Sequence, residues 1–156
     1  VHAGGHPRVL VMATPMTLRE EKFHALMQRF ESDAEILRLP CPGLVEYVEQ
    51  GVLEGAELEA FLANLFEPYQ SHPVDCVVLG CTHYVFLRPL LRESLPENVQ
   101  VLDGNEGTAR QLRRVLTEND LLCARETPGK ITLETSGAPE TVLPVMRRLL
   151  VRADTL

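Results

Sequence analysis

Apolar residues in this chain form short continuous runs, and these alternate with longer stretches in which apolar residues recur every three or four positions. Short runs bounded by turn residues are typical of buried strands, and the wider spacing is typical of amphipathic helices. The runs predict strands at Arg8–Ala13, Glu35–Leu39, Asp75–Gly80, Gln100–Asp103 and Ile131–Thr135. The spacing predicts helices at Leu18–Phe30, Leu44–Gln50, Glu54–Tyr69, Gly107–Asn119 and Pro139–Arg152, and one starting near Pro89.

Local signals refine several of these elements. Thr17–Glu20 fits a capping box at the start of the first helix, and Gly51 closes the second helix. The unbroken apolar run of Asp75–Gly80 predicts a strand buried on both faces. In the helix at Gly107–Asn119, the residues expected to point inward are Ala109, Leu112, Val115 and Leu116.

Strands that alternate with helices indicate an α/β fold with a parallel sheet of about four strands flanked by helices. The polar, proline-containing stretch Asn119–Lys130 is the one plausible linker. We therefore divide the chain coarsely into an α/β domain at 1–104 and a helix-strand-helix segment at 105–156. No internal repeat or low-complexity segment is visible.

Polar or reactive residues follow each of the first four predicted strands. They are Thr14, Cys41, Cys81 and Asp103. Parallel strands end at the same edge of a sheet, and open parallel sheets bind ligands outside that edge. The sequence therefore predicts a cleft floor formed by these residues.

The run from Val77 to Tyr84 carries the most chemistry. An apolar strand ends at Gly80, and Cys81, Thr82 and His83 follow directly. Thiolate is the reactive form of cysteine, and a nearby imidazolium stabilises it. Cys81 is therefore a candidate base or nucleophile, with His83 either holding it as an ion pair or polarising a substrate.

Other chemistries fit the residues less well. Zinc has potential ligands in Cys41, Cys81 and His83, but the paired spacings of structural zinc sites do not occur, so no metal is expected. A thiol hydrolase using Cys81 stays open, although the second glycine of a nucleophile elbow is missing. No glycine-rich phosphate fingerprint occurs, so no nucleotide cofactor is expected. We expect structural roles for Cys41 and Cys76 and none for Cys123.

Composition narrows the classes of partner. The 156 residues have a formal net charge of −7 and no basic cluster beyond adjacent arginine pairs, which argues against nucleic acid. The apolar runs are too short to span a membrane, and no leader opens the chain, so we expect a cytoplasmic protein. Four irregularly spaced cysteines fit a reducing compartment. Val1 in place of methionine indicates a fragment, a processed product or an excised domain.

Several segments together resemble the cofactor-independent aspartate/glutamate racemase family. Leu79-Gly80-Cys81-Thr82-His83-Tyr84 is similar to the second catalytic cysteine motif of that family, and its position after a buried strand fits. The resemblance extends to Cys41-Pro42 through Glu49-Gln50-Gly51, Thr14-Pro15-Met16-Thr17, Val101-Leu102-Asp103 and Thr135-Ser136-Gly137-Ala138-Pro139-Glu140. It spans nearly the whole chain.

The resemblance implies an enzyme that inverts the α-carbon of glutamate without pyridoxal phosphate, for peptidoglycan synthesis. It implies that Cys81 is one of two catalytic thiols, that His83 assists it, and that Glu49 orients the histidine or the substrate ammonium. Thr82, Thr14 and Thr17 are the implied substrate-binding residues. The resemblance also allows a homodimer.

The chain departs from the family in one major respect. The Asp-Ser and Cys-Asn-Thr motifs of the first half of the family are absent, so the chain resembles the second half alone. Val85 stands where the family usually has proline, and Ala13 where it usually has glycine. The predicted strand and helix near the C-terminus would then belong with the absent first domain. A non-catalytic binding module for a small acidic amino acid stays open as the alternative.

Overall fold

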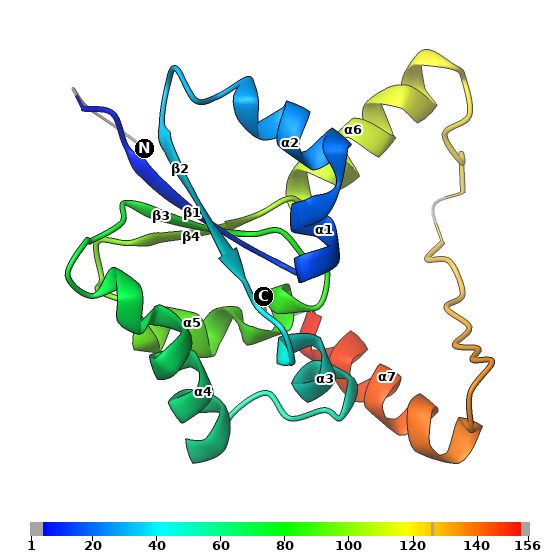
Figure 1. The fold of residues 1–156 in the computed structure, drawn as a ribbon. Helices are drawn as coiled ribbons and strands as arrows, with labels where there is room; N and C mark the ends of the chain where they lie inside the picture. The colour runs from blue at the N-terminus through cyan, green and yellow to red at the C-terminus, as the bar shows by residue number, and fades with distance from the viewer. Residues whose placement is uncertain (1–4, 126, 154–156) are drawn as a thin grey trace.

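A parallel sheet lies at the centre of the computed structural model, which describes residues 5–125 and 127–153 (Figure 1). Its strands are β1 (Arg8–Ala13), β2 (Glu35–Pro40), β3 (Cys76–Leu79) and β4 (Gln100–Asp103). They lie in the order β2-β1-β3-β4, and each neighbouring pair is parallel. The predicted α/β class and the first four predicted strands are thus confirmed.

Helices connect the strands, as the alternation of patterns predicted. They are α1 (Pro15–Arg19), α2 (Glu21–Gln28), α3 (Leu44–Glu49), α4 (Ala56–Phe66), α5 (Arg88–Ser94), α6 (Asn105–Glu118) and α7 (Pro139–Ala153). Two 3-10 turns complete the set, η1 (Glu67–Tyr69) and η2 (Tyr84–Leu87).

One face of the sheet carries the hydrophobic core. The register sets Leu10 beside Val77 and Val77 beside Val101, so their side chains share that face. Helices α3, α4 and α5 lie on this side (Figure 1) and contribute Leu44, Val48, Leu58, Leu62, Leu90 and Leu91 to the same buried cluster. Each fully buried leucine contributes about 1.5–3 kcal/mol, so this layer holds the sheet edge in place.

The opposite face is covered less completely. Helices α1 and α2 lie over β1 and β2 (Figure 1), whereas Leu102 on β4 is 44% exposed. Val78 on β3 is half-buried. The prediction that β3 is buried on both faces therefore holds for the other residues of the strand and fails at Val78.

The first predicted helix is two helices, and its cap is not the predicted one. Thr14 caps α1, because its side-chain oxygen accepts a hydrogen bond from the Thr17 backbone N–H at 3.2 Å. Glu20 has an extended backbone, which ends α1 before α2 begins. The capping box assigned to Thr17–Glu20 was wrong, because Thr17 lies inside α1.

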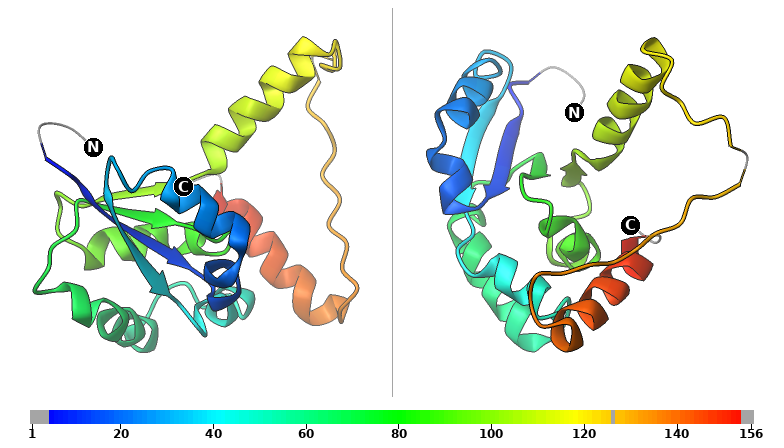
Figure 2. Two further views of the ribbon diagram at one scale, coloured as in Figure 1. Left: turned by 45° about the horizontal axis from the view of Figure 1, so that its top comes forward. Right: turned by 90° about the vertical axis from the view of Figure 1, so that its right-hand side faces the viewer.

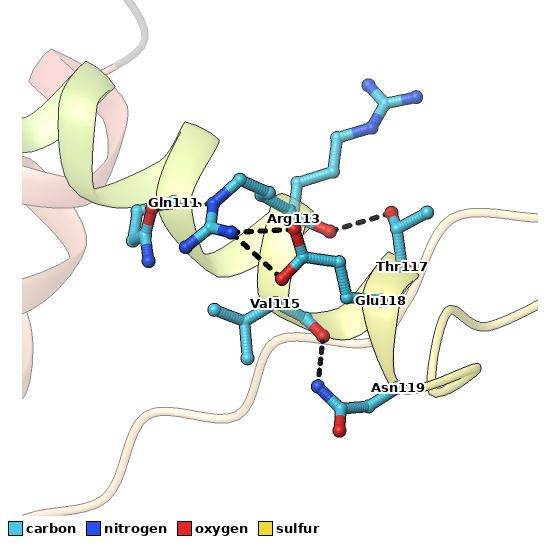
Figure 3. A network of polar contacts seen from close by, with 7 residues as sticks. Gln111, Arg113, Val115, Thr117, Glu118 and Asn119 are labelled. Atoms are coloured by element: carbon cyan, nitrogen blue, oxygen red, sulfur yellow. Dashed lines mark hydrogen bonds and ion pairs between the residues drawn. The ribbon is translucent and has the colours of Figure 1, made fainter.

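Helix α6 runs away from the end of β4 (Figure 1), and local contacts support it. Arg114 pairs with Glu118 at 2.6 Å, and Asn119 donates to the Val115 carbonyl at 2.8 Å (Figure 3). The inward orientation predicted for its apolar residues is not found. Leu112 is 58% exposed and Val115 39%, because no described element packs against them closely enough to bury them.

The segment between α6 and α7 differs most from expectation. Ile131–Thr135 forms no strand, and Ile131 is 69% exposed. A strand needs a neighbouring strand for its hydrogen bonds, and within the described residues none lies beside this segment. Figure 2 shows the segment passing outside the body of the molecule before α7 returns beside α3.

Candidate active site

The four residues predicted at the strand ends do lie at one edge of the sheet. Ala13 pairs with Pro40, which places Thr14 and Cys41 together after β1 and β2. Leu79 pairs with Asp103, which places Cys81 and the end of β4 at the same level. The backbone N–H of Cys41 also donates to the Ala13 carbonyl at 3.0 Å.

Gly80 determines how the chain leaves β3. Its backbone N–H donates to the Met12 carbonyl at 2.8 Å. A Cβ at this position would lie 2.8 Å from that same oxygen and 3.3 Å from the Cβ of Ala13. Only glycine fits so close to β1. The chain then turns, and Cys81 lies half-buried against the core.

The Cys81 thiol faces the His83 imidazole. The distance from Cys81 Sγ to His83 Nδ1 is 3.7 Å. A tight turn creates the contact, since the Tyr84 backbone N–H donates to the Cys81 carbonyl at 3.2 Å and η2 begins directly after His83. The two groups are therefore close enough to exchange a proton. An imidazole beside a thiol is the arrangement that activates the thiol.

Glu49 lies on the other side of the imidazole. Its Oε1 is 3.6 Å from His83 Nε2, with the histidine side chain 35% and the glutamate side chain 63% exposed. An exposed pair of this kind contributes between zero and about 1 kcal/mol. Its effect is to orient the ring. The structure thus brings Cys81, His83 and Glu49 together in a row.

Cys41 shares the edge but is held as a structural residue. Its thiol donates to the Leu39 carbonyl at 3.3 Å, and the hydroxyl of the buried Tyr84 donates to the Cys41 carbonyl at 3.3 Å. Burial raises the pKa of the Cys41 thiol to about 12, so it stays neutral at neutral pH. This supports the structural role expected from the sequence. Cys76 is buried as expected, and Cys123 is exposed.

The buried Cys41 thiol should make the protein less stable at alkaline pH. An unfolded thiol ionises near pH 8.5 to 9, whereas the folded one keeps its proton up to about pH 12. In this window the folded state binds more protons, so the free energy of unfolding should fall as the pH rises, by at most about 1.4 kcal/mol per pH unit.

Urea denaturation at about pH 8 and about pH 10 measures this slope in the parent chain and in Cys41→Ala. Burial also raises the pKa of Tyr84, so the difference between the two proteins isolates the thiol. An equal loss of stability in both would contradict the prediction.

The three threonines predicted to bind substrate have different surroundings. Thr14 and Thr17 lie with their hydroxyl oxygens 3.0 Å apart, at the start of α1. Both are half-buried and serve the helix cap in this structure. Thr82 is exposed on the turn between Cys81 and His83. Their role in binding stays a prediction.

Sequence reasoning missed Arg88 at this edge. Arg88 begins α5 and forms an ion pair with Asp103, whose other oxygen accepts the Asn105 backbone N–H at 2.7 Å. The side chains are 20% and 9% exposed. This pair joins the end of β4 to the helix that follows the Cys81 turn. No sequence spacing indicates it, because α5 and β4 meet only in the folded chain.

Other classes of site are less supported among the described residues. Residues 5–125 and 127–153 contain no group of three histidine, cysteine, aspartate or glutamate side chains arranged to hold a metal ion. No described helix has the length and hydropathy of a membrane span. A groove of about 540 Å³ lies at the amino-terminal edge of the sheet, lined by residues such as Phe66, Tyr69 and Leu95, and its lining has no thiol or imidazole.

The fold and the site define an α/β protein with a thiol, an imidazole and a carboxylate at the carboxyl edge of a parallel sheet. Comparisons with known proteins show which proteins of this class the chain is similar to. The chain is 42% identical over 143 residues to glutamate racemase of Clostridium acetobutylicum. It is 47% identical over 150 residues to glutamate racemase of Bifidobacterium animalis subsp. lactis. No protein-family model matches the chain.

Solved structures agree with these relatives. The crystal structure of Escherichia coli glutamate racemase, in complex with L-glutamate and the activator UDP-MurNAc-ala, superposes with a TM-score of 0.73 at 30% identity. The match covers 92% of this chain and 55% of that one. The chain spans 56% and 58% of the two curated relatives. The predicted resemblance is confirmed: the chain is related to glutamate racemases, which are isomerases, over about half of their length.

Proposed function

We propose that this chain forms one half of a cofactor-independent glutamate racemase and supplies one of its two catalytic thiols. The observation that carries the proposal is the row formed by Cys81 Sγ, His83 and Glu49, with distances of 3.7 Å and 3.6 Å. The relatedness to glutamate racemases supports glutamate as the substrate. The expected cofactor requirement is none.

The proposed chemistry begins with the Cys81 thiolate. It removes the α-proton of one enantiomer of glutamate, so an S–H bond forms as the α-C–H bond breaks and its electron pair stays on the α-carbon. A second thiol on the opposite face then donates a proton to that carbon, which inverts it. His83 holds the charge of the Cys81 thiolate, and Glu49 orients the imidazole. The hydroxyls of Thr82, Thr14 and Thr17 are the proposed contacts to substrate carboxylate and ammonium groups.

The second thiol is expected outside this chain. Cys41 is buried and neutral, and its thiol is committed to the Leu39 carbonyl. Cys76 lies within β3 and Cys123 lies beyond α6. We therefore place the opposing thiol in the part of the racemase to which this chain does not correspond.

Exposed apolar residues in α6 and near residue 131 support a missing half in a second way. Leu112 and Val115 of α6 and Ile131 beyond it are exposed, although an amphipathic helix normally buries its apolar face. We propose that these residues pack against the absent domain. Ile131–Thr135 would form its strand there, because it would find a neighbouring strand to pair with.

The proposed cellular role is the supply of D-glutamate for peptidoglycan synthesis in the cytoplasm. A homodimer is compatible with this role. We expect no nucleic-acid partner, since the net charge is −7.

Exchange of the α-proton of glutamate in deuterated water tests the proposal. The chain alone is expected to show no inversion of L- or D-glutamate. The chain joined to, or mixed with, the missing half of a related glutamate racemase should restore it, with deuterium at the α-carbon of the product. Circular dichroism measures inversion, and proton NMR measures exchange.

Two results would contradict the proposal. Calorimetric binding of glutamate by the completed protein without any exchange would favour the non-catalytic binding module. A covalent adduct of Cys81 with an activated acyl probe, without exchange, would favour a thiol hydrolase or transferase.

A further inference from the structure

The end of helix α3, which carries Glu49, has a tightly defined geometry. Gly51 follows with φ = +73°, in the left-handed region that glycine adopts without strain. Its backbone N–H donates to the Val48 carbonyl at 2.9 Å, and the Val52 N–H donates to the Tyr47 carbonyl at 2.8 Å. Glu49 is therefore positioned by a closed helix end of the kind that glycine permits.

A side chain from the far end of the sequence fills the space beside that glycine. A Cβ built on Gly51 would lie 2.7 Å from an Nη atom, 3.0 Å from Cζ and 3.5 Å from Nε of Arg148. The guanidinium of α7 thus lies against the backbone of Gly51. A cation at the C-terminal end of a helix interacts favourably with the helix dipole and with its unpaired carbonyls.

Helix α7 also contacts the element that directly follows the histidine. It touches η2, which begins directly after His83, and Leu149 packs against the buried core cluster. The neighbouring residues on the outer side of α7 are more exposed, with Val151 at 70%. Helix α7 therefore lies against both the end of α3 and η2, and Figure 1 shows α7 beside α3.

We propose that Arg148 is a positioning residue of the Cys81 site. By lying against Gly51 it holds the end of α3, so that the Glu49 carboxylate stays within reach of His83 Nε2. The inference rests on the proposed function, because Arg148 would then help to prepare the catalytic thiol. Without Arg148 the exposed end of α3 frays, and Glu49 no longer orients the imidazole.

The reactivity of Cys81 toward iodoacetamide tests this in the chain itself. A Cys123→Ser background removes the exposed competing thiol, while Cys41 and Cys76 are buried. Near neutral pH, Glu49→Gln should slow the alkylation of Cys81 by about two- to five-fold, as expected for loss of a partly exposed ion pair. In the Arg148→Gln background, Glu49→Gln should have almost no further effect. Each comparison keeps residue 148 constant, so the direct effect of its charge cancels.

Arg147→Gln is the matched control, because Arg147 is the neighbour of Arg148 on the same helix and is exposed like Arg148, whereas the three atoms nearest to a Cβ built on Gly51 all belong to Arg148. The effect of Glu49→Gln should keep its full size in that background. Unfolding midpoints establish that each variant is folded. If Arg148→Gln does not fold, Arg148→Met serves instead, since it keeps an unbranched aliphatic side chain and removes the guanidinium.

Equal slowing by Glu49→Gln in the parent and in the Arg148→Gln or Arg148→Met background would overturn the inference. The absence of slowing in the parent chain would overturn it as well. Neither result bears on racemisation, because alkylation needs neither glutamate nor a second thiol. Conversely, a completed protein that fails to racemise glutamate leaves the alkylation result unchanged.

Discussion

Cys81→Ala should reduce racemisation of glutamate by about 100- to 10,000-fold in a protein completed with the missing half, which is the range that a positioned acid or base contributes. The methyl group of alanine neither accepts nor donates a proton. Inversion needs a proton transfer on each face of the α-carbon, so the remaining thiol cannot complete it. The rate of inversion by circular dichroism, with kcat and KM determined separately, measures the loss. The decrease should lie mainly in kcat.

Cys123→Ala is the matched control for this experiment. It removes an exposed thiol that lies beyond α6 and far along the chain from the Cys81 turn, so activity should stay within about two-fold of the parent. Full activity in Cys81→Ala would refute the assignment of Cys81 as a catalytic base. A comparable loss in Cys123→Ala would place the reactive thiol elsewhere.

Gly80→Ala should lower the free energy of unfolding by about 1–3 kcal/mol, the usual cost of an inserted methyl group in a packed interior. The added Cβ would lie 2.8 Å from the Met12 carbonyl oxygen. This oxygen belongs to the backbone of β1 and is fixed by the sheet, so it cannot move aside as the end of a flexible side chain would. Urea denaturation gives the loss in stability. The alkylation rate of Cys81 in the folded variant reports whether its thiol has moved relative to His83.

Gly107→Ala provides the opposite case within the same chain. Gly107 lies in α6, and no atom lies within 4 Å of a Cβ built there. Alanine favours the helix over glycine by about 0.5–1 kcal/mol, so this variant should be more stable. The prediction for Gly80 would be wrong if both substitutions changed stability in the same direction by similar amounts.

Local patterns correctly predicted the elements whose packing partners lie within the described residues. Short apolar runs predicted β1 to β4, and each of these strands has a neighbouring strand with which to form hydrogen bonds. The pattern for Ile131–Thr135 is of the same kind and yet forms no strand, because no described strand lies beside it. Leu112 and Val115 of α6 are exposed for a similar reason. A hydrophobic pattern indicates which face of an element is to be buried. It does not indicate whether another element is present to bury that face.

The candidate site divides in the same way. Cys81 and His83 were predicted together because a tight turn joins residues two positions apart. Glu49 entered only through the family resemblance, since its contact with His83 joins α3 to the turn after β3. Thr14 and Thr17 were predicted to bind substrate, and their contribution to the cap of α1 became visible only in the structure.

The sequence by itself determined the α/β class, the four strands, and the thiol and imidazole at the end of β3, because these depend on periodicity and on contacts between near neighbours. Tertiary structure decided which distant groups complete the site: Glu49 beside His83, Arg88 with Asp103, and Arg148 against Gly51. The physical reason is that these contacts join side chains whose positions are set by the packing of separate elements on one core. No spacing along the chain records where such elements meet.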